Sequence, residues 1–406
     1  MTLTLSDLRI DASPRLSGWT RLSGRLRSDV GGAEEEYFIE VPDADAAALS
    51  TSGNSFLSWL APVASMRHEA LRIEAPVDAR LLEQVRQVVR VWRAWYPTMH
   101  DVSIDAPTST PEARVDPPLA ASMFTGGVDS FFTALRHAAG EGTPSTVEIP
   151  DLLFVHGFDV QLSNMSAWTH VTESLQPAAD SLGKRLVLVA SNLRDTRFGA
   201  ADWGRLAHGA ALAGVGHALG ARYDTILIGS SSGYRDLRPW GSHPLTDPMF
   251  SSTSVRILHD GAEFSRMQKV EYVVRSAIAL RHLRTCWQSP TGDNCQRCNG
   301  CYRTMLALDA LGALDECATF DRAALDMRHA AHIYCRHDYD FRLFAQVREL
   351  AQQVGRYDIA DAVGHSLAAS QILTQRLSRL ERLRSLPILQ RFVPNLERRL
   401  LRGWID

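Results

Sequence analysis

Residues 119–140, "LAASMFTGGVDSFFTALRHAAG", combine a short apolar run, a Gly-Gly turn and a stretch with helical spacing. The apolar run does not alternate with polar residues, which is typical of a strand that is buried on both faces. Glycines let the backbone approach a ligand closely, and a helix N-terminus after them adds positive potential. The sequence leaves two interpretations open, a structural turn or a phosphate-binding loop, for Thr125-Gly126-Gly127-Val128-Asp129-Ser130.

Three more apolar runs of this kind follow, at residues 151–158, 185–191 and 224–230, with helical stretches between them. Strands that alternate with helices predict an α/β fold with a parallel, doubly wound sheet covered on both faces. Ligands bind such sheets at the carboxyl ends of the strands. The Gly-Gly loop would lie at one of those ends.

Two further segments flank this region. Residues 1–116 predict a small α+β domain of unknown role, with a hairpin at 21–42 and an amphipathic helix that begins after Asp78 and ends at Pro97. A Pro-rich linker leads into the central domain, residues 117–310.

Residues 311–406 predict a helical C-terminal region. Its end, residues 376–406, is rich in arginine and fits either an amphipathic helix packed on the protein or on a second subunit, or a basic arm for nucleic acid. The amphipathic interpretation rests on an apolar stripe of Leu377, Leu380 and Leu383.

A cluster of cysteines lies at residues 286–301, "CWQSPTGDNCQRCNGC". Two-residue gaps let consecutive thiolates bend round one ion, and four thiolates complete a closed tetrahedral zinc site. An iron–sulfur cluster and a pair of disulfides are the alternatives. The candidate ligands of a structural Zn²⁺ are Cys286, Cys295, Cys298 and Cys301.

The loop after the fourth apolar run, "IGSSSGYRDLRPWGSHPLTDP", would open at the same edge of the sheet as the Gly-Gly loop. A Tyr ring can stack on a planar ligand, an Asp can accept from an amino group, and an Arg can bind a carboxylate. The candidate substrate-binding residues are Ser232, Tyr234, Asp236 and Arg238. The alternative is a surface loop with its own salt bridge.

One set of glycines resembles a dinucleotide-binding fingerprint but lies inside a predicted helix: Gly214, Gly216 and Gly220. Because that fingerprint needs a strand directly before it, close helix packing is the better interpretation.

Together, these motifs resemble the PP-loop ATP pyrophosphatase group and, within it, the 7-cyano-7-deazaguanine synthase family of queuosine biosynthesis. Residues 125–130 match that group's Ser-Gly-Gly-x-Asp-Ser loop with Thr in the first position, and residues 232–239 match the family's Ser-Gly-Tyr-x-Asp-x-Arg-Pro stretch. The four cysteines also match, as does Lys269 before them. The extra segments at both ends suggest a divergent member.

The resemblance implies a sheet like that of the adenine-nucleotide alpha hydrolases and an ATP-dependent ligase that forms a C–N bond. ATP with Mg²⁺ would adenylate the carboxylate of a 7-deazaguanine-type acid and release pyrophosphate, and ammonia would then give an amide or, with further ATP, a nitrile. Asp129, Ser130 and Lys269 would be the catalytic residues, with ATP on residues 125–130. The extra domains suggest a specialised relative that joins the deazapurine to another amine in a bacterial defence or modification system. Two alternatives are an RNA-thiolating PP-loop enzyme and a non-catalytic nucleotide-binding scaffold.

Composition limits the classes of partner. The 406-residue chain is 45% hydrophobic and carries a formal net charge of -3, so no overall basic field attracts nucleic acid or membrane. Its first residues lack a secretory signal, and its apolar runs fall short of the roughly 20 residues that span a bilayer. We therefore expect a soluble cytoplasmic protein with no membrane partner. A protein partner bound through residues 1–116, a homodimer and nucleic acid stay open.

Overall fold

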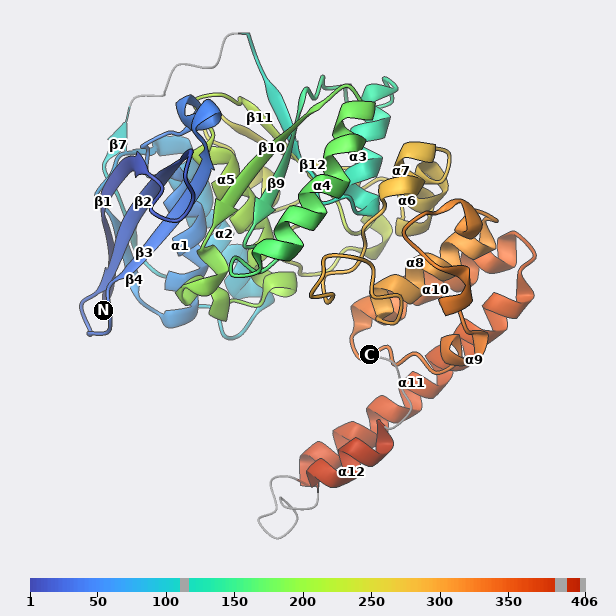
Figure 1. The fold of residues 1–406 in the computed structure, drawn as a ribbon. Coiled ribbons are helices and arrows are strands. Elements are labelled where there is room, and N and C mark those ends of the chain that lie inside the picture. Colours follow the sequence, from blue (N-terminus) through green and yellow to red (C-terminus); the bar gives the residue numbers. More distant parts are fainter. Residues whose placement is uncertain (110–116, 384–392, 402–406) are drawn as a thin grey trace. The chain divides into compact units, whose positions relative to one another are not determined.

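The computed structural model describes residues 1–109, 117–383 and 393–401. The chain forms two compact units, residues 1–265 and residues 266–406 (Figure 1). This division lies inside the segment predicted as the central domain, so the boundaries predicted at 116/117 and 310/311 stay predictions.

A ten-stranded sheet forms the first unit, with the strand order β12-β11-β8-β9-β10-β3-β2-β1-β4-β6. Most neighbouring pairs are parallel, and the predicted α/β class is confirmed as a large, mixed, mostly parallel sheet. Its five consecutive parallel strands are β8 (Ala120–Met123), β9 (Asp151–His156), β10 (Arg185–Ser191), β11 (Thr225–Gly229) and β12 (Arg256–Asp260).

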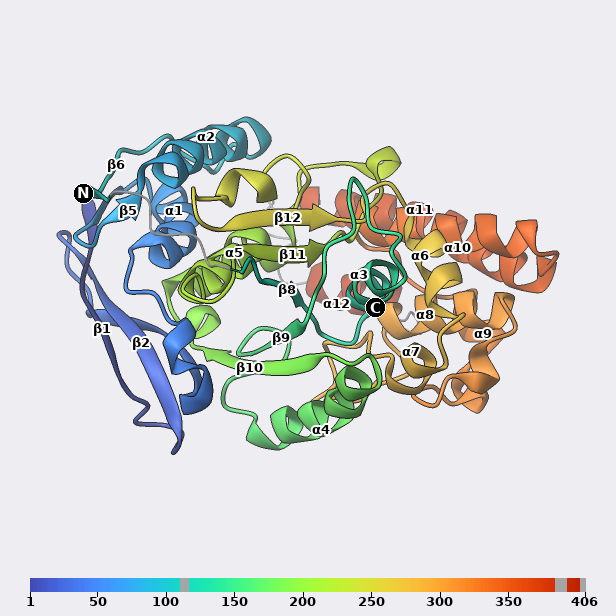
Figure 2. The ribbon, with the colours of Figure 1, turned by 90° about the horizontal axis from the view of Figure 1, so that it is seen from above.

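Four of these strands coincide with the four predicted apolar runs. The fifth, β12, was not predicted, because its sequence "RILHD" carries three polar residues in five positions. If these five strands are numbered 1 to 5 along the chain, their order across the sheet is 3-2-1-4-5, which is the order of a doubly wound sheet. Figure 2 shows α3 (Val128–Ala138) and α4 (Met165–Ser181) on one face of these strands and α5 (His208–Ala218) on the other.

The N-terminal strands extend the same sheet. β2 (Trp19–Ser28) and β3 (Glu35–Pro42) form the predicted hairpin, and Tyr37, Ile39 and Val41 are buried as one face of it. The remaining strands are β1 (Thr2–Ala12), β4 (Ala70–Ile73) and β6 (Ile104–Asp105), while β5 (Val77–Asp78) and β7 (Thr108–Ser109) pair separately.

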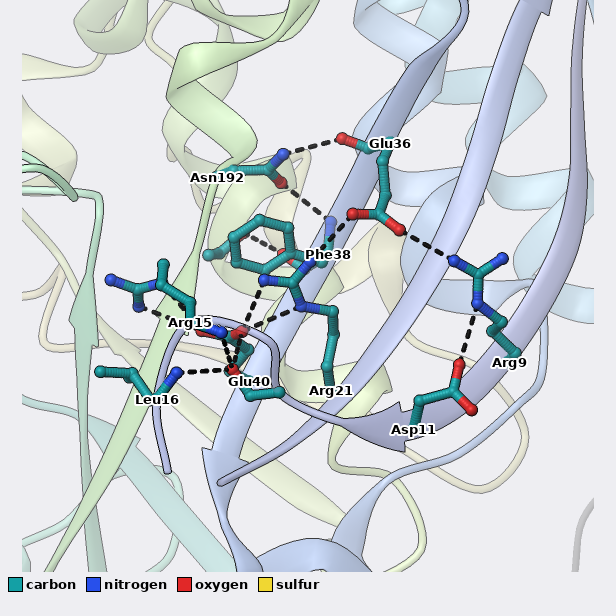
Figure 3. A network of polar contacts seen from close by, with 11 residues as sticks. Arg9, Asp11, Arg15, Leu16, Arg21, Glu36, Phe38, Glu40 and Asn192 are labelled. Carbon is teal, nitrogen blue, oxygen red and sulfur yellow. Dashed lines mark hydrogen bonds and ion pairs between the residues drawn. The ribbon is translucent and has the colours of Figure 1, made fainter. Parts of the chain in front are cut away.

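The hairpin joins the central strands through β3, which pairs antiparallel with β10. Asn192, directly after β10, accepts a hydrogen bond from the Phe38 backbone N–H at 2.8 Å and donates to the Glu36 carbonyl at 2.7 Å (Figure 3). On the same strand, the fully buried Glu40 carboxylate forms ion pairs with both Arg15 and Arg21. A buried charge needs such paired donors, and here the pairs fix the start of the chain against β3.

Two helices of the N-terminal segment cover the sheet on the side of α5: α1 (Asn54–Arg67) and α2 (Ala79–Trp95). The Asp78 side chain caps α2 by accepting from the Leu81 N–H, as the sequence predicted. The α1–α5 contact is close because Trp59 Nε1 donates to the Ala211 carbonyl, and a Cβ at Gly214 would lie 2.1 Å from that nitrogen. Gly214 therefore serves helix packing, as predicted.

The second unit is helical. Helices α8, α10 and α11 pack together in it, and the predicted C-terminal helices are confirmed. Its helices are α6 (Arg266–Val273), α7 (Ala277–His282), α8 (Asn299–Ala310), α9 (Met327–Ala330), α10 (Asp338–Gln353), α11 (Tyr357–Leu383) and α12 (Val393–Leu400).

The arginine-rich end of the chain is only partly covered by these helices, since residues 384–392 and 402–406 lie outside the described residues, as do residues 110–116 of the predicted linker. Leu377 and Leu380 are half-buried on α11 among exposed neighbours, as an amphipathic helix requires. Across the described ranges, none of the helices is both long enough and apolar enough to span a bilayer.

Candidate functional site

The Gly-Gly loop connects the central strand β8 to the first turn of α3. Gly126 has φ 76°, a backbone conformation that glycine adopts without a Cβ penalty. Gly127 is the N-cap residue of α3. Because glycine has no side chain, it cannot cap the N–H groups of the first helical turn. Uncapped N–H groups at a helix N-terminus favour an anion.

The hydroxyl of Ser130 closes the loop on itself. It donates to the Gly127 carbonyl at 3.0 Å and accepts from the Thr125 N–H at 3.4 Å. Ser130 is buried, whereas Thr125 and Asp129 are half-buried and lie at the rim. The loop thus holds the Ser130 hydroxyl inside, while Thr125 is partly exposed and Asp129 is partly exposed with its Oδ1 buried.

Strand order places this loop beside the loop that follows β11. From β8 the chain moves through β9 to β10 on one side, and β11 and β12 lie on the other side of β8. The gap between β8 and β11 is therefore the switch point of the sheet, where ligands of open α/β sheets bind. The approach is close: a Cβ at Gly229, the last residue of β11, would lie 2.9 Å from the Asp129 carbonyl oxygen.

The loop after β11 encloses a small cavity of about 10 Å³. Two of the four predicted substrate residues, Ser232 and Arg238, line it, and the Arg238 guanidinium lies 4.7 Å from the centre of the Trp240 ring. The other two do not: the Tyr234 side chain is 59% exposed, and Asp236 lies in the same short 3₁₀ turn. The lining residues are Ser230, Ser232, Leu237, Arg238, Trp240, Ser242, His243, Pro244 and His259.

A buried charge cluster behind α3 was not predicted. The Asp260 carboxylate at the end of β12 accepts from Thr133 at 2.7 Å, Arg136 at 2.7 Å and His137 at 3.0 Å. Burial alone would raise the pKa of Asp260, but the hydrogen bonds from His137 and Thr133 and the charge of Arg136 outweigh it and hold that pKa below its usual value. The cluster fixes α3, and with it the Gly-Gly loop, against β12. Arg136, which follows the apolar residues Phe131, Phe132, Ala134 and Leu135 in α3, was the sequence signal that could have revealed it.

The four predicted zinc ligands lie together in the second unit. Their Sγ atoms are all within 4.8 Å of one another, with 3.9 Å between Cys286 and Cys298 and 3.8 Å between Cys295 and Cys301. Thiolates about 2.3 Å from one zinc ion lie about 3.8 Å apart in a tetrahedron, whereas the sulfurs of a disulfide lie about 2.0 Å apart. The four cysteines can therefore hold a structural zinc.

The chain around the cysteines is shaped for this cluster. The Asn294 side chain is buried and accepts from the N–H groups of Thr285 and Cys286, which fixes the first ligand beside the later three. The Cys298 N–H points at the Cys295 sulfur at 3.4 Å, and Cys298 is also the N-cap residue of α8. Such N–H groups stabilise thiolate charge.

Lys269, the remaining predicted catalytic residue, lies on α6 and is buried. It belongs to the second unit, so its role at the Gly-Gly loop stays a prediction.

Comparison of the chain with family models, curated proteins and solved structures gave no match.

Proposed function

We propose that the protein is an ATP-dependent enzyme that activates a carboxylate by adenylation and releases pyrophosphate. The position of the Gly-Gly loop carries this proposal. The loop joins the central strand to a helix N-terminus at the switch point of the sheet, and the end of β11 lies within contact distance of it. A polyphosphate chain bound at the first loop would place the rest of a nucleotide across that gap.

The residues suit pyrophosphate as a leaving group. A carboxylate oxygen attacks the α-phosphorus of ATP, the bond to the β-phosphate oxygen breaks, and the negative charge develops on pyrophosphate. The N–H groups of the first α3 turn and the hydroxyl of Thr125 would stabilise that charge where it forms. Asp129 would help to hold Mg²⁺, which neutralises the phosphates.

The acid would bind at the loop after β11, in line with the sequence resemblance to 7-cyano-7-deazaguanine synthases. Arg238 can pair with a carboxylate, and Tyr234, being exposed, can stack on a planar ring at the mouth of the loop. Ammonia or another amine would then displace AMP to form an amide. In the specialised form of this reaction, the amine would belong to a protein substrate or partner that residues 1–116 recruit.

An RNA-thiolating activity fits less well. Such an enzyme needs a sulfur-carrying cysteine, and four of the six cysteines form the candidate metal cluster. A nucleotide-binding scaffold without catalysis is the second outcome that the experiment must recognise.

The test is isotope exchange between pyrophosphate and ATP, which reports adenylation without any amine. We expect exchange that depends on 7-carboxy-7-deazaguanine and that falls at least tenfold in Ser130→Ala, which opens the loop. Ser166→Ala removes an exposed hydroxyl from the first turn of α4 and should leave exchange unchanged. Absence of exchange with this acid and with other heteroaromatic acids, together with retained ATP binding, would establish the scaffold instead.

A further inference from the structure

His259 of β12 is buried in the wall of the cavity after β11. Its side chain is 2% exposed, and the ring is one of the groups that line the cavity. The segment that supplies part of the wall, "WGSHPLTDP", is also not the pattern expected of the family that the chain resembles.

Asp247 fixes the orientation of this ring. Asp247 begins the short 3₁₀ turn Asp247–Phe250, is fully buried, and its Oδ2 lies 2.8 Å from His259 Nδ1. Ser242 donates its hydroxyl to the same carboxylate oxygen, and the His243 N–H donates to the other oxygen. Because a carboxylate only accepts, Nδ1 carries a hydrogen, and in the neutral ring the lone pair is then on Nε2.

Nε2 of His259 is a buried acceptor for which the described residues provide no hydrogen-bond donor. An unpaired buried acceptor is costly, so Nε2 calls for a hydrogen-bond donor beside it. The cavity volume of about 10 Å³ is close to the space that one water-sized molecule needs. A group with one heavy atom that donates hydrogen bonds, such as a water molecule or ammonia, fits this space.

The cavity also lies next to the Gly-Gly loop. Ser230, the first residue after Gly229, lines the cavity, and Gly229 itself abuts the Asp129 carbonyl. The cavity wall carries the Arg238 guanidinium, and the Asp247 carboxylate lies behind it against His259. Ammonia, or the terminal nitrogen of a primary amine, is small enough for this cavity.

We propose that this cavity binds the nitrogen nucleophile and that His259 is the general base of amide formation. The inference rests on the proposed adenylating function and assigns the amine site within it. The nitrogen attacks the acyl carbon of the adenylate, the new C–N bond forms, and the bond from that carbon to the AMP oxygen breaks. One N–H proton passes to His259 Nε2 and AMP leaves with the electron pair. Asp247 is a positioning residue, which holds the tautomer and stabilises the imidazolium.

The two half-reactions separate this proposal from the one on which it rests. Exchange between pyrophosphate and ATP measures adenylation, and mass spectrometry of the product formed with ammonia measures amide synthesis. We expect His259→Gln to keep exchange within about twofold of the wild type while amide synthesis falls about 100-fold or more, the usual range for loss of a general base. Asp247→Asn should act in the same direction, because an amide that donates to Nδ1 forces the hydrogen onto Nε2.

His170→Gln, an exposed change on α4, is the matched control and should alter neither half-reaction. Retained exchange in His259→Gln also shows that the variant is folded. Unchanged amide synthesis in that variant would overturn the amine site. An equal loss of both half-reactions would also overturn it, provided that an unaltered thermal unfolding temperature shows the variant to be folded. If the wild type shows no exchange with any acid, the proposed function fails first and the amine site with it.

Discussion

Gly229 is the residue at which a minimal change tests the geometry of the site. A Cβ there would lie 2.9 Å from the Asp129 carbonyl oxygen and 3.1 Å from its carbonyl carbon, and ordinary contact begins at 3.4 Å. Both neighbours are backbone atoms, so Gly229→Ala must displace the first turn of α3 by about 0.5 Å relative to β11. The change adds one methyl group and removes no polar atom.

A displacement of this size has a calculable effect on the reaction. A misplacement of about 1 Å can reduce an enzymatic rate about 100-fold, so a shift of half that size should lower pyrophosphate exchange about tenfold. The free energy of unfolding should fall by about 1–3 kcal/mol, as overpacking usually costs. Exchange and chemical unfolding would be measured on the same preparation, well below the unfolding temperature.

Gly216→Ala is the control, since it overpacks the sheet away from the loop. Its Cβ would lie 2.8 Å from Ile226 Cγ1, a side-chain atom near the start of β11. We expect a similar loss of stability with exchange close to that of the wild type. Equal exchange in the two variants would refute the argument that the α3 turn and the end of β11 together position the reacting groups.

Three further outcomes are expected. Elemental analysis should find one zinc ion per chain in the wild type and in the control variant Cys317→Ser. The zinc content of Cys298→Ser should be a small fraction of this value. Iron in the purified protein would contradict the zinc assignment. Gly214→Ala should lower the free energy of unfolding by about 3 kcal/mol, because it drives the Trp59 indole from its position and breaks its hydrogen bond; Trp59→Leu in the same chain should recover part of that loss. The lowered pKa of Asp260 implies stability that is fully present above an ordinary carboxyl pKa of about 4 and is lost as the pH falls through the folded value. Urea unfolding from about pH 5 to about pH 2 should show this loss, and Asp260→Asn should be less stable at pH 7 yet lose less on acidification.

The strands could be predicted where burial alone determines the sequence. β9, β10 and β11 are covered on both faces, so their residues are almost all apolar and the pattern is local. β12 lies at the edge of the sheet and ends in His259 and Asp260, whose partners are 12 residues away or on another element. A pattern within five residues cannot reveal such pairing.

The same distinction separates the predicted parts of the site from those that were missed. The Gly-Gly loop and the cysteines are contiguous or closely spaced, because a tight turn and a single ion require neighbours in sequence. The cavity needs three segments: the loop after β11, the turn that carries Asp247, and β12. Its assembly depends on strand order, which the sequence left undetermined.

The N-terminal segment takes part in this assembly directly. Trp95 of α2 packs edge-on against the His243 ring in the cavity wall, with 5.0 Å between ring centres, and α2 packs on the turn that begins with Asp247. On the other side, α1 packs on α5. The second residue of α5 is Gly209, and a Cβ there would lie only 2.5 Å from Asp247 Oδ1. Two helices from residues 1–109 thus support the element that orients His259. Residues 1–109 therefore help to build the cavity that we propose as the amine site.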